Sequence, residues 1–485
     1  MINSNIKINE NIIKENYNNA PDITLRYLEE QKEKITIVFN QSLCSTSSIN
    51  ESILRNIALL TNKKTFFKKD LYTILKKTLA ANNVKEVNTY KEIYSKLSNG
   101  FTIILFDKKD KALAVETKQE LSRAISEPLT EQTISGPKDA FNENYMTNIG
   151  LVRKRIKTDN LKIEEKIIGR ESKTKVSIMY MDNIIEKNLL DELNKKLENI
   201  DIDGIIDSTY IKELILKKDS IFPLLETTER PDHATMSLLE GRILIFVENS
   251  PYAIIIPTFF FDFFHAPEDN YQNYKNVTFT RLIRFFAFFI ATQLPAIYIA
   301  MTTYNQEAIP TTLLTNFATQ RAGVPFPAIV EALGMILIFE VLRESDIRMP
   351  NFSGSAISIL GAIVLGDAAV SAGIVSPIML ITIATSAICS LMYSNAGMIN
   401  AIRIWRIIFM IFATIFGIPG VFLADFIFII NLCELKSLGK PYLYPITPFS
   451  FKFLKRNIGK SSIRKDNERS PILTDKNYKR SNLWK

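Results

Sequence analysis

Three carboxylates lie in strongly apolar sequence in the second half of the chain, at Glu331, Glu340 and Asp367. Charged side chains are costly inside a lipid bilayer, and where they occur they commonly mark an ion path. Rings of such carboxylates in an oligomer would attract cations, and we assign this role to Glu331. The alternative is an ion pair with Arg321 or Arg343, which we favour for Glu340 because Arg343 lies three residues later. For Asp367 both interpretations stay open.

The small-residue stretch 354–374 has the composition of a helix that lines an ion path. Small residues permit close helix packing, and polar groups can replace part of an ion's water shell. Helical spacing places Ser358 and Leu365 on one face and Val364 and Asp367 on another. Our hypothesis is that Val364 or Leu365 forms an apolar gate that loses its water when closed. The alternative is ordinary close packing of helices within the subunit.

An aromatic run with two acidic neighbours precedes the apolar half. Aromatic side chains favour the headgroup region of a membrane, so the run is a candidate interfacial coupling segment. The alternative is the buried end of a strand. The residues concerned are Phe261, Asp262, Phe263, Phe264, Pro267, Glu268 and Asp269.

No catalytic or cofactor-binding motif is found in the sequence. Gly459-Lys460-Ser461 lacks the first glycine of a P-loop, because Leu454 stands there, and it does not follow a strand. The chain has 2 His and 3 Cys, too few and too scattered for a zinc site. We therefore expect no enzyme activity, no cofactor and no metal site.

Composition indicates two unlike halves. The 485 residues are 47% hydrophobic, with 59 Lys+Arg against 51 Asp+Glu and a mean hydropathy of +0.06. Such apolar content excludes a disordered chain, and 17 Gly exclude collagen. Residues 435–485 carry 13 basic and 3 acidic residues, so they supply the whole positive excess. This basic cytoplasmic tail is expected to bind anionic lipid, and no nucleic acid is expected as a partner.

Long uncharged runs after residue 284 predict a polytopic membrane domain over 285–434. Residues 285–306 carry no charge, and the 54 residues between Arg348 and Arg403 carry only Asp367. We predict spans at about 285–304, 354–374, 377–398 and 404–433, the last kinked at Gly417. Residues 324–345 form an interfacial or re-entrant helix, since two acids interrupt it. Four crossings keep both ends in the cytoplasm; five would export the basic tail.

The first half predicts soluble α/β structure. Strand-like alternation at 34–40, 102–107 and 111–117 flanks a helical stretch at 51–79. A second set begins with a strand at 173–181 and ends in a hairpin about 249–251. The predicted fold is two α/β subdomains, 34–135 and 136–258, after a poorly structured segment 1–33. A coupling segment 259–284 then leads into an all-α membrane bundle.

Several motifs taken together resemble the A subunit of GerA-type spore germination receptors. The resemblance runs in order from roughly Asp22 to Phe449, leaving about the last 35 residues outside it. The motifs are Ser135-Gly136-Pro137, Gly169-Arg170-x-Ser172-Lys173-Thr174-Lys175-Val176, Asp203-Gly204-Ile205-Ile206-Asp207-Ser208, Thr228-Glu229-Arg230-Pro231-Asp232, Leu239-Glu240-Gly241-Arg242, Phe261–Phe264 with Pro267-Glu268-Asp269, residues 324–350 and residues 369–377.

The resemblance implies a nutrient-responsive receptor in the inner membrane of a bacterial spore, with its soluble half and its C-terminal tail facing the core. It implies a permease-like B subunit and a lipoprotein C subunit as partners. It further implies a homo-oligomeric cation channel opened by a germinant. In this family the choice of germinant is attributed mainly to the B subunit. Glu331 and Glu340 match the family pattern.

Three positions depart from that pattern. Asp367 stands where a neutral polar residue is usual, Ile336 where a third acid is frequent, and His265 where Gln is usual. Two other functions remain as alternatives: a non-conducting scaffold subunit, and a secondary transporter. The transporter would show inverted repeats, and no second copy of either half is found in the sequence.

Overall fold

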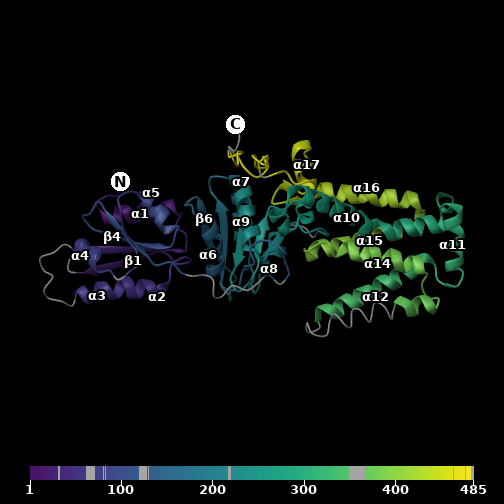
Figure 1. The fold of residues 1–485 in the computed structure, drawn as a ribbon, viewed down its shortest axis with the longest axis horizontal. Coiled ribbons are helices and arrows are strands. Elements are labelled where there is room, and N and C mark those ends of the chain that lie inside the picture. Colours follow the sequence, from purple (N-terminus) through teal and green to yellow (C-terminus); the bar gives the residue numbers. More distant parts are fainter. Residues whose placement is uncertain are drawn as a thin grey trace.

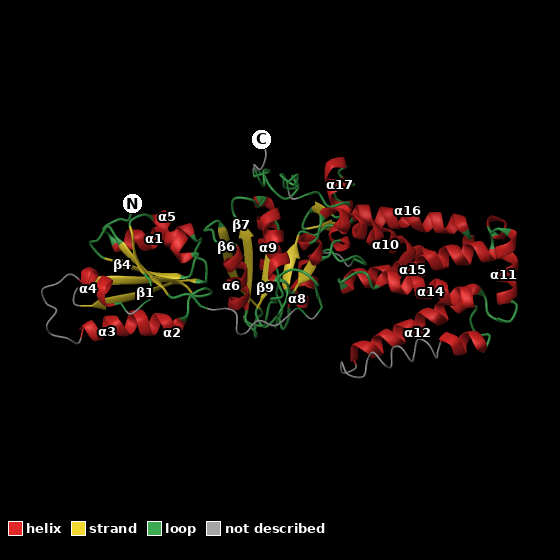
Figure 2. Ribbon diagram, viewed as in Figure 1, coloured by secondary structure: helices red, strands yellow, loops and turns green. Residues whose placement is uncertain are grey.

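The computed structural model is elongated, with two sheet-containing bodies followed by a helical bundle (Figure 1). Figure 2 shows the strands gathered in the first two parts, while the third is helical. The structure describes residues 1–485 except 31–32, 62–70, 80, 82, 120–127, 129, 217–219, 349–365, 463, 476 and 482–485. The predicted fold class, two α/β units before an all-α half, is confirmed.

The first body is a five-stranded antiparallel sheet with helices on both faces. The strands lie in the order β1-β2-β4-β5-β3, and three of the predicted strands, β2, β4 and β5, are confirmed. The elements are α1 (Ile6–Asn16), β1 (Ile23–Glu30), β2 (Glu33–Asn40), α2 (Thr46–Ile49), η1 (Asn50–Leu54), α3 (Arg55–Thr61), α4 (Leu71–Thr78), β3 (Val84–Val87), α5 (Tyr90–Leu97), β4 (Phe101–Phe106) and β5 (Ala112–Glu116).

The prediction that residues 1–33 are poorly structured is wrong. Helix α1 and the edge strand β1 belong to the first body, and β1 pairs with β2 over eight residues. Ile6 and Ile13 are buried against the sheet on one side of α1, seven residues apart. Two anchors in a helix otherwise rich in Asn, Lys and Glu are enough, because the sheet supplies the opposing apolar surface.

The second body repeats this topology, with strand order β6-β7-β9-β10-β8. The predicted hairpin about 249–251 is confirmed, since β9 pairs antiparallel with β10. The elements are α6 (Tyr145–Arg155), β6 (Leu161–Ile168), β7 (Thr174–Met181), α7 (Lys187–Glu198), α8 (Ser208–Ile215), β8 (Glu226–Thr228), α9 (Pro231–Glu240), β9 (Ile243–Val247) and β10 (Ala253–Ile256).

The two bodies also have the same pair of asparagine hydrogen bonds at their first helices, α1 and α6. Buried Asn9 accepts a hydrogen bond from Asn3 N (2.9 Å) and donates one to Asn3 O (2.7 Å). Buried Asn148 does the same with Asn142, at 2.9 and 2.6 Å. One contiguous hydrophobic cluster joins the bodies. A buried ion pair between Asp22 and Arg153 (Oδ2 to Nε 2.5 Å) lies at the same junction.

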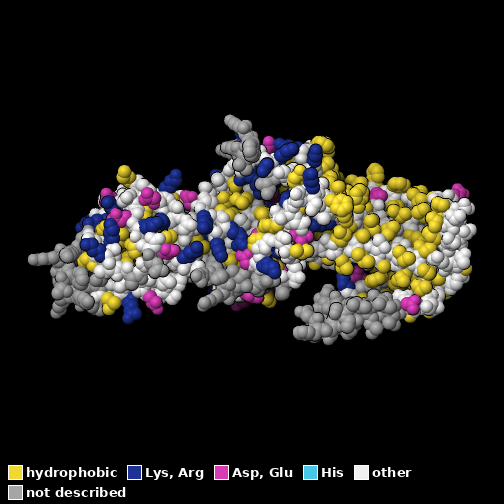
Figure 3. All heavy atoms as spheres, in the orientation of Figure 1, with side chains coloured by type: hydrophobic (Ala, Val, Ile, Leu, Met, Phe, Trp, Pro, Cys, Tyr) yellow, Lys and Arg dark blue, Asp and Glu magenta, His cyan; other side chains and the backbone are white. Residues whose placement is uncertain are grey.

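The second half is a bundle whose outer surface is largely apolar (Figure 3). Two helices, α10 and α15, are long and apolar enough to cross a membrane, and α14 is a shorter apolar helix; this holds for the described residues. The elements are η3 (Phe260–Phe264), η4 (Pro267–Tyr271), α10 (Tyr274–Thr303), η5 (Gln306–Ala308), α11 (Thr311–Arg321), α12 (Ala328–Arg348), α14 (Pro377–Ser390), α15 (Ala396–Phe416) and α16 (Ile418–Glu434).

The predicted last span, 404–433, is wrong as a single helix. The chain turns at Gly417, whose φ of 67° suits glycine, and α15 and α16 form a helical hairpin. The sequence is apolar on both sides of Gly417, so it does not indicate the turn. The span predicted over 377–398 ends at Ser390. Of the span predicted over 354–374, residues 354–365 lie outside the described residues and 366–371 are helical.

The C-terminal segment folds back onto the second body. It contains β11 (Lys436–Ser437), β12 (Lys440–Pro441) and α17 (Phe451–Ile458). Leu473 is buried in the cluster beneath the second sheet. Basic residues of this segment pair with acids of the second body, as in Lys440 with Glu186 and Arg456 with Glu240. The segment predicted as a basic tail is therefore packed against protein over much of its length.

Candidate functional site

The aromatic coupling segment is buried between the second body and the bundle. Phe260 packs against Phe222, Phe288 and Tyr442, with ring centroids 5.9, 5.6 and 6.1 Å apart. Phe261, Phe263 and Phe264 are also buried. The segment is a 3-10 helix inside the protein, so it matches neither an aromatic face at the headgroups nor the end of a strand. Burial of this much aromatic surface stabilises the junction between the second body and the bundle.

The acidic residues of the segment divide between the two sides of the junction. Asp262 accepts a hydrogen bond from Phe259 N at the start of η3 and pairs with Arg242 at 2.7 Å, on the side of the sheet. Pro267 begins η4. Glu268 is half-buried and has no hydrogen bond or ion pair with a described residue.

Asp269 ties η4 to the first long helix. It pairs with Arg281 (Nε to Oδ2 2.9 Å) and with Arg284 (Nη2 to Oδ1 3.0 Å), and Arg284 also donates to Phe264 O. Burial would raise the pKa of Asp269, but the hydrogen bonds and charges of the two arginines outweigh it and lower the pKa. A charged carboxylate therefore holds the start of α10 against the 3-10 elements.

Glu331 is fully buried near the start of α12. Its Oε2 accepts hydrogen bonds from Ser376 N (3.0 Å) and Ser376 Oγ (2.9 Å), and its Oε1 lies 3.7 Å from Arg321 Nε. Carboxylates stabilise helix N-termini, and Ser376 is the N-cap of α14. Glu331 thus links α11, α12 and α14, and its ion-pair alternative, Arg321, is the partner observed.

Glu340 is ion-paired in the middle of the bundle. It contacts Arg343 at 2.9 Å on its own helix and Arg403 of α15 at 2.7 Å. Four crossings would place Arg403 near the outer face of the membrane, where basic residues are disfavoured. The structure supplies its partner from a residue 63 positions earlier in the chain.

The predicted ion-path residues fall partly beyond the structure. Ser358, Val364 and Leu365 lie outside the described residues. Asp367 lies in the helical stretch 366–371 and is exposed. Within the part of the chain that the structure describes, its carboxylate has no hydrogen-bond or ion-pair partner. The three ion-path residues that the structure describes are not brought together: Glu331 and Glu340 pair with other side chains of the protein, and Asp367 faces outward.

Sequence reasoning missed a buried polar cluster around Pro295 of α10. Proline has no amide hydrogen, so the carbonyl of Ala291 loses its helical partner. Ser386 Oγ (2.7 Å) and Arg406 Nε (2.8 Å) both donate to that carbonyl. Proline inside a predicted span was the available signal. Asp425 of α16 accepts a hydrogen bond from Gln293 of α10 at 2.6 Å.

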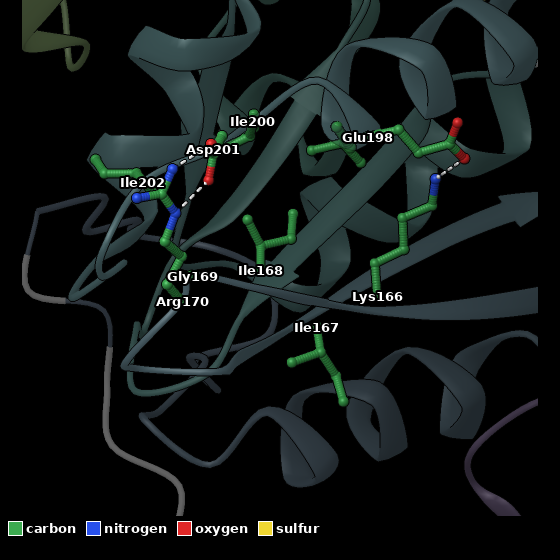
Figure 4. A pocket seen from close by; sticks show the side chains of 10 residues that line it. Lys166, Ile167, Ile168, Gly169, Arg170, Glu198, Ile200, Asp201 and Ile202 are labelled. Carbon is green, nitrogen blue, oxygen red and sulfur yellow. Dashed lines mark hydrogen bonds and ion pairs between the residues drawn. The ribbon is translucent and has the colours of Figure 1, made fainter.

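An open pocket of about 510 Å³ lies on the second body, beside the end of β6 (Figure 4). Arg170 pairs with Asp201 (Nε to Oδ1 2.7 Å) and Lys166 with Glu198 (2.9 Å) across it. Ser172 accepts a hydrogen bond from Ile205 N, which brings two of the family-like motifs side by side. These four charged side chains are paired with one another, so they are not available to bind a ligand in the pocket.

Comparison with known proteins gives one consistent result. The family model described as Bacillus/Clostridium GerA spore germination protein matches residues 11–472, which corrects the narrower limits of Asp22 to Phe449. Spore germination protein KA of Bacillus subtilis is 38% identical over 91% of this chain and 82% of that protein. An uncharacterized membrane protein of Bacillus subtilis, YfkQ, is 39% identical over 77% of this chain and 73% of its own.

A solved structure is also similar. It is the N-terminal domain of the A subunit of the Bacillus megaterium spore germinant receptor GerK3, with 30% identity and a TM-score of 0.43. The match covers 53% of this chain and 97% of that one.

Proposed function

Because the chain belongs to the GerA spore germination protein family as a receptor A subunit, we propose that several copies of it form a ligand-gated cation channel in the spore inner membrane. The channel would open in response to a nutrient germinant and release cations at the start of germination. A permease-like B subunit and a lipoprotein C subunit are the proposed partners, with the B subunit selecting the germinant.

The observation that carries this proposal is the outward-facing carboxylate of Asp367. It lies on an apolar half of the molecule, six residues before the turn at Gly373, or about 9 Å along a helix. A charged group facing lipid costs about 2.5–3.5 kcal/mol even by the lowest scales. Facing a water-filled path between neighbouring copies removes this cost. Val364 and Leu365 precede it by three and two residues in the sequence and remain our candidates for the gate, with Ser358 on the same path.

Orientation follows from where the chain enters and leaves the bundle. The start of α10 and the end of α16 both lie near the second body (Figure 1). Tyr442, which follows α16, packs there on Phe260. Both bodies and the C-terminal segment would therefore lie on one side of the membrane, for which we propose the spore core. This arrangement needs an even number of crossings. Figure 3 shows the apolar band that lipid and neighbouring subunits would cover.

The test is reconstitution of the purified subunit, alone and together with the B and C subunits, in potassium-loaded vesicles to which a mixture of nutrients is added. We expect potassium release, altered in rate or selectivity by Asp367→Asn. Glu307→Gln is the matched control, because Glu307 is another exposed carboxylate, in η5. Release by the wild type that is indifferent to Asp367→Asn, or absence of release from vesicles containing confirmed oligomers, contradicts the proposal.

A non-conducting scaffold is the second candidate, favoured by one observation. Glu331 and Glu340, which match the family pattern, are satisfied within a single chain and hold α12 to α14 and α15. Such pairs suit a rigid support. Under this alternative, vesicles with the A subunit alone stay sealed, and release requires another subunit.

A further inference from the structure

A partly open cavity of about 410 Å³ lies where four distant parts of the chain meet. Its walls come from the end of α9, from η3, from the first turns of α10 and from the C-terminal segment, which in Figure 1 runs over the junction of the second body with the bundle. The volume lies within the range of small-molecule sites. Phe259, Phe453 and Leu473 supply an apolar part of the wall.

The lining carries more positive than negative groups. Its carboxylates are Glu226, Glu240, Asp262 and Asp466. Its cationic side chains are Arg242, Arg281, Arg456, Lys460, Arg480 and His233. Six cations against four carboxylates leave two positive charges in excess. Asp269 and Arg284, which pair behind Arg281, leave that excess unchanged.

His233 belongs among the cations. Burial alone would lower the pKa of its imidazole, but the carboxylate of Glu226, 2.8 Å away, overrides burial and raises the pKa to about 9. The ring is therefore protonated at neutral pH.

The carboxylates are shared among the arginines and cannot neutralise all of them. Glu240 lies 3.4 Å from Arg456, 3.8 Å from Arg480 and 3.9 Å from Arg242. Asp466 lies 3.1 Å from both Arg456 and Arg480. Each carboxylate thus serves two or three guanidinium groups.

One cation in the lining has no carboxylate partner among the described residues, and one guanidinium nitrogen has no acceptor there. Lys460 Nζ donates to the backbone carbonyls of Asp269 and Gln272, and among the described residues no carboxylate pairs with it. Burial and the nearby charge of Arg281 lower the pKa of Lys460. Buried Arg242 Nε has no hydrogen-bond acceptor among the residues that the structure describes. Half-buried Lys460 is thus a cation without a paired carboxylate, and Arg242, although paired with Asp262, keeps one donor without an acceptor among the described residues, so both can still contact an anion.

We propose that this cavity binds a phosphate group, carried by a small soluble molecule or by the headgroup of an anionic lipid. Arginine and lysine side chains are the usual protein partners of phosphate. Lys460 and Arg281 lie beside the first turns of α10, where a headgroup would reach the cavity from the bundle side. The occupant would touch η3, α10 and the C-terminal segment at once. This inference is independent of whether the chain conducts ions.

The test of a soluble ligand is calorimetric titration of the purified full chain with inorganic phosphate in phosphatidylcholine nanodiscs. We expect saturable binding that Lys460→Gln weakens about tenfold, since one charge-assisted contact is lost. Arg480→Gln, which alters a partly exposed lining residue, should act in the same direction and decides the matter if Lys460→Gln does not fold. Lys440→Gln is the matched control, because Lys440 pairs with Glu186 outside the cavity.

The test of a lipid source uses nanodiscs that contain phosphatidylglycerol. Native mass spectrometry should then find phosphatidylglycerol retained by the wild type and by Lys440→Gln and lost from Lys460→Gln and Arg480→Gln. Either arm supports the proposal by itself and identifies the source. Absence of both kinds of binding in the wild type, or binding that is equal in all variants, overturns it.

Discussion

The two α/β bodies have the same strand order and the same asparagine pair, yet different segments of the chain cover their sheets. The outer face of the first sheet is covered by helices α3 and α4 of its own body. The corresponding cluster of the second body includes Leu438, Tyr444 and Leu473 from the end of the chain. The second body contacts the bundle through η3, Asp269 and Phe222, which packs on Trp405 of α15 and Phe428 of α16. The comparison teaches that a duplicated topology acquires different roles from the segments added around it.

The largest effect is expected at the junction that only the second body has. Asp269→Asn leaves Arg281 and Arg284 buried without a carboxylate, which should destabilise the full chain by about 3–5 kcal/mol. Thermal unfolding of the full chain in detergent measures this loss. Glu268→Gln, a half-buried neighbour without a described partner, is the control. Equal stability of the two variants would show that the aromatic cluster alone holds the junction.

The next effect concerns the contribution of the C-terminal segment to the second body. Leu473→Ala should cost about 2–5 kcal/mol, because Leu473 is buried in that body's core. Leu59→Ala, on the exposed side of α3, should cost little. The same unfolding measurement compares them. A neutral Leu473→Ala would mean that the second body is complete without the segment, as the first body is.

A smaller effect tests how alike the two bodies are. Asn9→Ala and Asn148→Ala each leave two backbone groups without their partner, so each should cost about 1–3 kcal/mol. Asn99→Ala removes only an exposed hydrogen bond and is the control. Hydrogen exchange at the starts of α1 and α6 locates each loss. A large loss at one site and none at the other would contradict the structural equivalence.

A last effect is the contribution of histidine to the pH dependence of stability, which comes from the second body and its junction because the chain's 2 His are His233 and His265. The pKa of His233 is raised to about 9 in the folded state, so its contribution to stability is complete below about pH 6.5 and is lost as pH rises through 9. Burial and the charge of Arg281 lower the pKa of His265 to about 4, so its contribution is lost as pH falls from about 6.5 through 4.

Histidine variants separate the alkaline and the acidic parts of the pH profile of stability. In thermal unfolding across pH, His233→Gln should flatten the alkaline side and His265→Gln the acidic side. A profile that neither substitution changes would assign the pH dependence to carboxylates elsewhere.

The sequence predicted those elements whose pattern is local. The strands at 34–40, 102–107 and 111–117 alternate clearly, so they could be located before the structure was known. Helix α1 was missed because its two buried isoleucines gain meaning only from the sheet opposite. The pair Asp22–Arg153 joins residues 131 positions apart, and no local pattern reports such a contact.

In the apolar half, composition identified the region but not its folding. A continuous apolar run does not distinguish one long helix from a hairpin, so Gly417-x-Pro419-Gly420 was interpreted as a kink rather than a turn. The carboxylates of α12 were recognised as unusual, but the partner Arg403 comes from another helix. Their burial could not be predicted, because it depends on which helices lie side by side.

The proline in α10 gives this bundle an internal lever. Arg281 and Arg284 fix one end of the helix to the soluble part, while the carbonyl exposed by Pro295 is held by Ser386 of α14 and Arg406 of α15. Any bending of α10 at that proline moves the Ala291 carbonyl, to which side chains of α14 and α15 both donate hydrogen bonds. A displacement applied at the junction therefore reaches α14 and α15 together, without any contact between those helices and the soluble bodies being needed to relay it.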